Sequence, residues 1–322
     1  MAEHVIELRD LVKQYGSYRA VDGLTLSIRR GEIFGLLGPN GAGKTTTILM
    51  MLGLTEPTSG MVRVCGIDAT YEPIRVKRKV GYLPDEVGFY EDMTALENVL
   101  YTAALNGIEP DEAVRRARYL LEQVGLAEQA DKKVRSFSHG MKRRLGLADV
   151  LVKQPEVIIL DEPTNGIDPE GVRELLALIR RLSRQEGVTV LLSSHHLHQV
   201  QQICDRVGIF VAGRLIAVGD ISELARQLFA DEPLLFQVEA EPLDGELLKR
   251  LAALTSVVRL ERKGHRLALY CREDVAADIA AAVVTSGARL KSLSRQDYGL
   301  DEIYHRYFQG GGGDNGADGT VH

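Results

Sequence analysis

The sequence predicts an α/β fold, in which a mainly parallel sheet with helices on both faces is followed by a smaller α+β domain. Strands and helices alternate between residues 4 and 220, which is typical of a parallel sheet. Several of the strands are short, continuous apolar runs, as expected where both faces of a sheet are covered. These runs are Ile33–Leu37, Val80–Leu83, Val157–Leu160 and Val188–Leu192, while Leu24, Leu26 and Ile28, like Val62 and Val64, alternate with polar residues as in half-buried strands.

Capping residues mark where helices begin. A helix is expected from about Thr45, directly after a glycine-rich loop. Thr94 and Glu97 have the spacing of a capping box, and Asp168 followed by Pro169 predicts an N-cap with proline at the first helical position. The stretch between the predicted strands Val80–Leu83 and Val157–Leu160 is mostly helical, so we expect a helical lobe inserted into the first domain at about residues 86–154.

The C-terminal region has a different pattern, beginning at about residue 223. Its predicted order, βαββαβ with a final helix, indicates a ferredoxin-like unit over residues 223–308. The glycine-rich, polar residues 309–322 predict a disordered tail. The predicted strands are Leu234–Glu241, Ser256–Glu261, Arg266–Cys271 and Arg289–Leu293, and the predicted helices are Asp244–Leu254, Val275–Ser286 and Leu300–Phe308.

Composition excludes several classes of protein. With 39 basic and 45 acidic side chains in 322 residues, the net charge is −6, whereas a general nucleic-acid binder needs a basic face. The three cysteines, Cys65, Cys204 and Cys271, lie far apart, which excludes a disulfide scaffold and fits a reducing cytosol. The N-terminus lacks a signal-peptide pattern, and no run approaches the roughly 18–20 apolar residues that span a bilayer, so we expect no membrane insertion.

The clearest chemical signal is a glycine-rich loop between a predicted strand and a predicted helix. Residues 38–45 fit the phosphate-loop pattern G-x-x-x-x-G-K-[ST], in which successive backbone N–H groups face one anion. Lys44 is expected to reach the β- and γ-phosphates of a nucleotide, and the Thr45 hydroxyl to bind Mg²⁺. The predicted nucleotide-binding residues are Gly38, Pro39, Asn40, Gly41, Ala42, Gly43, Lys44, Thr45 and Thr46.

Two acidic residues follow the strand Val157–Leu160. A carboxylate at the end of a buried strand lies at the carboxyl edge of the sheet, where open α/β folds bind ligands. Asp161 is therefore expected to complete the Mg²⁺ shell, and Glu162 to orient and deprotonate the attacking water. A helix cap or a solvated turn would also explain such a pair, but the phosphate loop in the same sheet favours the catalytic interpretation.

Residues 136–144, Ser-Phe-Ser-His-Gly-Met-Lys-Arg-Arg, resemble the signature loop of the ATP-binding cassette (ABC) family, whose usual form is Leu-Ser-Gly-Gly-Gln. Residues 165–168 resemble the family's D-loop, and Ser193-Ser194-His195 its switch histidine. The resemblance covers about residues 4–220. It implies a phosphate-loop NTPase cassette over residues 1–222, with a parallel core sheet, an antiparallel β subdomain and a helical subdomain.

The resemblance also implies roles for individual residues. Tyr15 matches the aromatic residue that stacks on adenine, and His195 the residue that contacts the γ-phosphate. Ser138 and Gly140 match the signature residues that contact the nucleotide of an opposing subunit, and Asp168 belongs to the D-loop. The family works as a head-to-tail dimer with two shared ATP sites, so a homodimer is expected here.

Two positions depart from the family pattern. The usual glutamine of the Q-loop falls on Asp85, which is expected to face Mg²⁺ or the attacking water; Glu86 is the alternative for this role. His139 replaces the first glycine of the signature. A position with positive φ would disfavour histidine, but the retained Gly140 is expected to preserve the loop.

The resemblance implies the Mg²⁺-dependent ATPase subunit of an exporter, located on the inner face of the cell membrane through a separate permease. The C-terminal domain is then expected to serve dimerisation or regulation. The alternative is a soluble ABC ATPase without a membrane partner, for example in cofactor assembly. A different phosphate-loop enzyme, such as a kinase or GTPase, is disfavoured because it would not carry the signature and the switch histidine.

Overall fold

The computed structural model describes residues 3–229, 233–264, 266–296 and 300–310. The chain divides into two compact units, Met1–Ile221 and Ser222–His322. Among the residues described, no helix combines the length and the apolar character needed to cross a bilayer.

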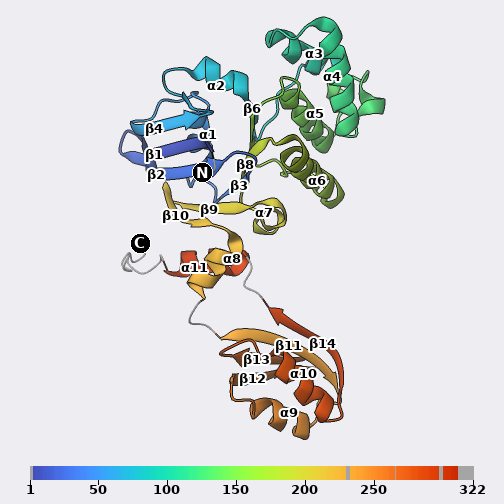
Figure 1. The fold of residues 1–322 in the computed structure, drawn as a ribbon. Coiled ribbons are helices and arrows are strands. Elements are labelled where there is room, and N and C mark those ends of the chain that lie inside the picture. Colours follow the sequence, from blue (N-terminus) through green and yellow to red (C-terminus); the bar gives the residue numbers. More distant parts are fainter. Residues whose placement is uncertain (1–2, 230–232, 265, 297–299, 311–322) are drawn as a thin grey trace, which may run out of the picture. The chain divides into compact units, whose positions relative to one another are not determined.

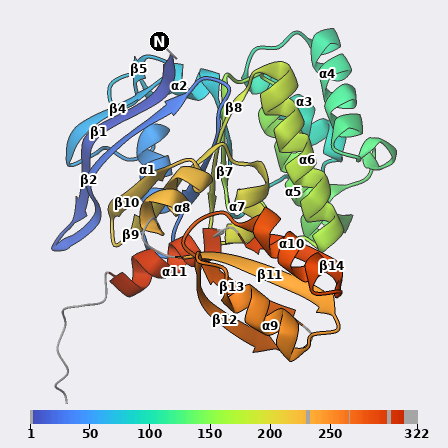
Figure 2. The same cartoon turned by 60° about the horizontal axis from the view of Figure 1, so that its bottom comes forward.

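A six-stranded sheet of order β10-β9-β3-β8-β7-β6 forms the centre of the first unit. Every neighbouring pair in it is parallel except β10 with β9. The parallel strands run between helix α1 (Lys44–Met51) on one side and α6 (Pro169–Glu186) on the other (Figure 2), as the alternating pattern predicts. The strands are β3 (Ile33–Leu37), β6 (Val80–Leu83), β7 (Val157–Asp161), β8 (Thr189–Ser194), β9 (Arg206–Val211) and β10 (Arg214–Gly219).

A second, antiparallel sheet has the order β2-β1-β4-β5. Its strands share one hydrophobic core with α1 and the central sheet, in which Val62, Ile48 and Phe34 are fully buried. This core holds the phosphate loop between two sheets. The bounds are β1 (His4–Tyr15), β2 (Tyr18–Arg29), β4 (Ser59–Val64) and β5 (Ile67–Asp68), with α2 (Pro73–Lys79) following.

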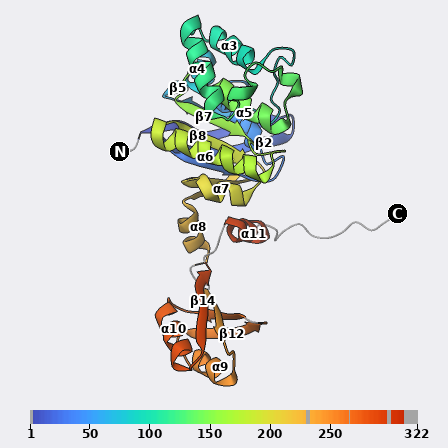
Figure 3. The same ribbon diagram turned by 90° about the vertical axis from the view of Figure 1, so that its right-hand side faces the viewer.

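The predicted helical lobe consists of α3 (Ala95–Leu105), α4 (Pro110–Gln123) and α5 (His139–Leu151), gathered at one end of the unit (Figures 1 and 3). The capping box that starts α3 is present, because Thr94 and Glu97 exchange side-chain-to-backbone hydrogen bonds. Short 3₁₀ turns at Ala127–Gln129 and Val134–Ser136 connect α4 to α5. Helix α7 (Leu197–Ile203) completes the unit after β8.

The second unit contains an antiparallel sheet of order β12-β13-β11-β14, and its elements after α8 follow the predicted chain order βαββαβ with a final helix. Helices α9 and α10 cover one face of it, and Phe236, Leu251 and Ile279 belong to their common core. The predicted tail begins inside α11, and its remaining residues 311–322 lie outside the described residues. The elements are α8 (Ile221–Leu228), β11 (Leu234–Glu241), α9 (Gly245–Ala252), β12 (Val257–Lys263), β13 (Arg266–Cys271), α10 (Ala276–Thr285), β14 (Arg289–Gln296) and α11 (Leu300–Gly310).

Candidate active site

The phosphate loop connects β3 to α1, and two of its glycines are required by its geometry. Gly41 and Gly43 have φ of +79° and +106°, a region that side chains disfavour. A β-carbon on Gly43 would also lie 2.2 Å from the carbonyl oxygen of Ala20 in β2. Lys44 is buried, and its Nζ donates hydrogen bonds to the carbonyl oxygens of Gly38 (2.8 Å) and Pro39 (3.2 Å). The loop therefore closes around the lysine that is expected to meet phosphate.

Asp161 ends β7 beside the start of α1. Its Oδ2 accepts a hydrogen bond from the Thr45 hydroxyl at 2.9 Å, and its Oδ1 accepts one from the Ser193 hydroxyl. The residue is only 3% exposed. A hydroxyl and a carboxylate oxygen are hard ligands of the type that Mg²⁺ prefers, so these residues fit the predicted metal site.

Glu162 lies between two cationic or polar partners. Its Oε1 is 3.4 Å from Lys44 Nζ, and its Oε2 is 3.0 Å from His195 Nδ1. The Oε1 atom is buried and makes an ion pair but no hydrogen bond among the described residues. The backbone of Glu162 is left-handed, with φ of +47°, and Ser193 accepts a hydrogen bond from its N–H. Such strain in a residue that is not glycine is typical of functional sites.

A pocket of about 390 Å³ brings the predicted phosphate and acid residues together. Tyr18, rather than Tyr15, is the tyrosine among its lining residues, and the Tyr18 hydroxyl donates a hydrogen bond to the carbonyl oxygen of Gly41 at 3.3 Å. Tyr15 is half exposed, and the Lys13 ammonium lies 4.9 Å from its ring centre. The pocket is lined by Tyr18, Ala20, Asn40, Gly41, Ala42, Gly43, Lys44, Thr45, Thr46, Asp85, Asp161, Glu162 and Asn165.

Ser138, Gly140 and Asp168 lie at the starts of two helices and do not line this pocket, whereas Asn165 of the D-loop does. The Ser138 side chain caps α5 by accepting a hydrogen bond from the backbone N–H of Met141, and Gly140 lies in the first turn. The Asp168 side chain caps α6 by accepting one from Gly171, as its sequence predicts. The family roles of Ser138, Gly140 and Asp168 therefore require a neighbouring subunit.

Asp85 does line the pocket, whereas Glu86 does not. The Oδ1 atom of Asp85 accepts hydrogen bonds from Arg143 at 2.7 Å and from the Asn165 side chain at 3.2 Å. The sequence analysis placed Arg143 in the signature stretch and Asn165 in the D-loop, but gave neither residue a role of its own. The burial of Arg143 in α5 could not be predicted from the sequence, because a basic residue in a predicted helix is expected on the exposed face of that helix.

The three neighbouring histidines have different surroundings. The His195 and His196 rings lie 4.0 Å apart, and burial, with the neighbouring His195, lowers the pKa of His196. The lowered pKa favours the neutral form of His196. The His198 ring instead contacts the Gln202 side chain at 3.2 Å. Only His195 of the three contacts Glu162 among the described residues.

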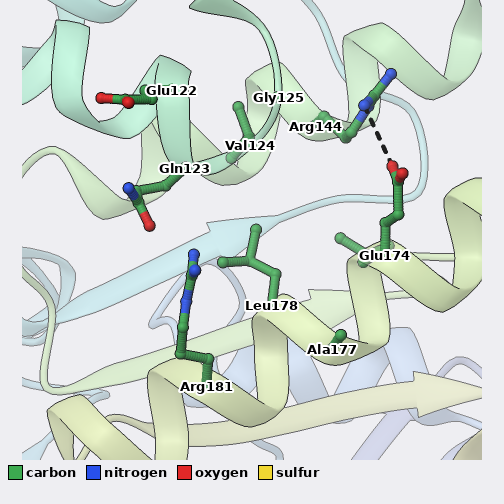
Figure 4. A pocket seen from close by; sticks show the side chains of 10 residues that line it. Glu122, Gln123, Val124, Gly125, Arg144, Glu174, Ala177, Leu178 and Arg181 are labelled. Atoms are coloured by element: carbon green, nitrogen blue, oxygen red, sulfur yellow. Dashed lines mark hydrogen bonds and ion pairs between the residues drawn. The ribbon is translucent and has the colours of Figure 1, made fainter.

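A larger hollow, of about 590 Å³, lies between α4, α5 and α6 and contains none of the predicted site residues. Figure 4 shows Arg144 reaching Glu174 across it, with Arg181 and Leu178 on the α6 side. The ion pair joins Arg144 NH1 to Glu174 Oε2 at 3.5 Å. It therefore links the helical lobe to the catalytic part of the unit, away from the phosphate loop.

The fold and this site define a phosphate-loop nucleotide hydrolase. The family profile described as "ABC transporter" matches residues 21–165. The chain is 35% identical over 305 residues to the linearmycin resistance ATP-binding protein LnrL of Bacillus subtilis, covering 93% of this chain and 97% of the relative. It is 44% identical over 212 residues to the bacitracin transport ATP-binding protein BcrA of Bacillus licheniformis, covering 66% and 68%.

A solved structure described as the ATP-binding subunit of an ABC transporter has a TM-score of 0.64 and 31% identity, covering 69% of this chain and 92% of that one. The chain belongs to the ABC transporter family. Within that family it is an ATP-binding and ATP-hydrolysing subunit, and its cassette is the predicted α/β fold.

Proposed function

We propose that this chain is the Mg²⁺-dependent ATPase of an exporter, acting on the inner face of the cell membrane with a separate permease and a second copy of itself. The observation that supports the catalytic part of this proposal is the position of Glu162. Its carboxylate is held between Lys44 and His195, next to the Thr45–Asp161 pair. The residues proposed as base, phosphate-binding cation and metal ligands thus lie around one pocket.

In this arrangement different residues bind the phosphates, accept the proton and hold the metal ion. The backbone N–H groups of the phosphate loop and Lys44 bind the β- and γ-phosphates. Glu162 accepts a proton from the attacking water, and His195 orients the Glu162 carboxylate. Thr45 and Asp161 would hold Mg²⁺, which neutralises charge on the phosphate oxygens. Asp85 faces the same pocket, and Tyr15 is proposed to stack on the adenine.

The dimer is proposed because three of the predicted recognition residues, Ser138, Gly140 and Asp168, lie outside the chain's own pocket. Ser138 and Gly140 start α5, where backbone N–H groups at the helix N-terminus favour an anion. A second copy would bring these residues to the γ-phosphate, and Asp168 to the interface. ATP contacts that exist only in the closed dimer favour closure by their differential affinity.

A membrane partner is proposed on the surface that carries exposed apolar side chains. Leu54, Ile74 and Leu105 are 53%, 62% and 71% exposed. We propose that the permease covers these side chains. The helical lobe that carries Leu105 would then transmit closure to the permease.

The direction of transport is proposed from the relatives, two of which are named for linearmycin resistance and for daunorubicin/doxorubicin resistance. The experiment is affinity purification of the chain in mild detergent, in the presence of ATP, followed by mass identification. A polytopic membrane protein in near-equal amount is the expected result. Recovery of soluble proteins alone would instead favour a soluble ABC ATPase.

A further inference from the structure

The two positions that depart from the family pattern, Asp85 and His139, contact the same residue. The Asn165 side chain donates a hydrogen bond to Asp85 Oδ1 at 3.2 Å. The carbonyl oxygen of Asn165 lies 3.0 Å from His139 Nε2. Asn165 is therefore held from both its side chain and its backbone, by the Q-loop and by the signature loop.

Asp85 is in turn fixed by a buried arginine of the helical lobe. Arg143 is 1% exposed and donates hydrogen bonds to Asp85 Oδ1 (2.7 Å) and to the carbonyl oxygen of Pro84 (2.6 Å). A buried guanidinium requires oxygen acceptors for its N–H groups, because an unsatisfied buried donor is costly inside a protein. Gly146 brings α5 close enough, since a β-carbon there would lie 2.5 Å from Leu83 Cδ1.

The contacts continue from Asn165 to the residue proposed as the base. The backbone N–H of Asn165 donates a hydrogen bond to the carbonyl oxygen of Glu162 at 3.2 Å. A continuous path of hydrogen bonds thus leads from Arg143 in the helical lobe, through Asp85 and Asn165, to Glu162. Each member other than the deeply buried Arg143 lines the nucleotide pocket.

We propose that Arg143 and Asp85 are positioning residues, which set the place of Asn165 and through it the backbone of Glu162 for ATP hydrolysis. This inference rests on the proposed ATPase function. Arg143 holds the Asp85 carboxylate in place, and this carboxylate accepts a hydrogen bond from the Asn165 amide. Movement of the helical lobe therefore reaches the base through this path. The Arg144–Glu174 ion pair links the same two parts of the unit but lies away from the pocket, so it provides a control.

The test reverses the polarity of one hydrogen bond in the purified full chain. Asn165→Asp replaces a donor with a carboxylate at the 3.2 Å contact with Asp85, so the two side chains repel. The Asp85→Asn and Asn165→Asp double variant restores a donor and an acceptor in the opposite order. Glu174→Gln makes a matched carboxylate-to-amide change in the control ion pair. Asn165 is only partly buried, so its variants are expected to fold.

The readouts are kcat and KM for ATP, with a thermal melt of each variant. We expect Asn165→Asp to lower kcat at least about tenfold with KM within about twofold, the double variant to recover most of that loss, and Glu174→Gln to match wild type. Wild-type kcat in Asn165→Asp, or a double variant no better than Asn165→Asp, would overturn the inference. A wild-type chain without ATPase activity would instead count against the proposed function.

Discussion

The imidazole of His139 lies where a side chain on Gly166 would have to be. A β-carbon on Gly166 would approach His139 Cδ2 to 2.8 Å, and the backbone of Gly166 has φ of +69°. The histidine that replaces a signature glycine is therefore accommodated by a glycine in the D-loop of the same chain.

Gly166→Ala is expected to lower ATPase activity for two separable reasons. The left-handed backbone costs a side chain about 1 kcal/mol, and the clash displaces His139 from the Asn165 carbonyl. Gly187→Ala carries the same backbone cost, with φ of +70°, but meets no atom within 4 Å. Steady-state ATPase assays should show a larger loss for Gly166→Ala than for Gly187→Ala, and adding His139→Ala to Gly166→Ala should cause little further loss, because the contact between His139 and Asn165 is already broken. Equal losses in the two glycine variants would contradict the role of the clash.

Glu162→Gln is expected to retain ATP binding and lose about 100-fold or more of turnover, because the amide cannot accept a proton. Since bound ATP then persists, the variant should accumulate as an ATP-dependent dimer, measured by light scattering after size-exclusion chromatography. Glu170→Gln, an exposed change in the first turn of α6, is the control. Wild-type turnover in Glu162→Gln would remove Glu162 from the role of base.

Lys44→Ala is expected to weaken ATP binding by about 100-fold or more, because it removes the cation at the centre of the phosphate loop. It also leaves Glu162 Oε1 without its ion-pair partner at 3.4 Å, so the melting temperature should fall. Isothermal titration with ATP measures the first effect, and Lys142→Ala, whose ammonium pairs with Glu91, is the control. Undiminished affinity would refute the phosphate-binding role.

Asp149 should make stability depend on pH. Burial raises the pKa of its carboxyl to about 6, and a hydrogen bond from Thr102 and the charge of Lys153 only partly oppose this. Between about pH 4 and about pH 6, the folded chain therefore keeps a proton on Asp149 that the unfolded chain has lost, because the ordinary pKa of this carboxyl is 3.8. The contribution of Asp149 to the free energy of unfolding falls as the pH rises through this range.

Asp149→Asn removes that penalty. Above pH 6 it should be more stable than wild type, by up to about 3 kcal/mol, while near pH 4 the two should converge. Urea unfolding followed by circular dichroism at pH 4.5 and pH 8 measures the difference, with the exposed change Asp131→Asn as control. A difference independent of pH would show that the carboxyl titrates normally.

The accuracy of the sequence-based predictions depended on the kind of element. Strands β3, β6, β11 and β13 begin and end at the predicted residues, because each is an apolar or alternating run with clear limits. Strand β8 extends to Ser194, beyond its predicted end at Leu192, because Ser193 and Ser194 are buried strand residues with side chains typical of loops. Whether such serines are buried in a strand depends on the strands that lie beside them.

The site residues divide in the same way. The phosphate loop and Asp161–Glu162 follow local patterns, and the structure brings both to one pocket. The contacts of Arg143, Asn165 and Tyr18 were not predicted, since they join segments that are distant along the chain. Arg143 lies 58 positions from Asp85, and Asn165 lies 80 positions from it. Spacing along the chain contains no information about such contacts.

The ferredoxin-like unit has a consequence for how this gene family can change. All the buried members of its core lie between Phe236 and Ala288, so none comes from the catalytic unit. Recombination near the boundary at Ile221 could therefore add, remove or exchange the unit without opening either hydrophobic core. The catalytic core would remain complete while the attached module changed, so the sequence of one unit places few packing constraints on the sequence of the other.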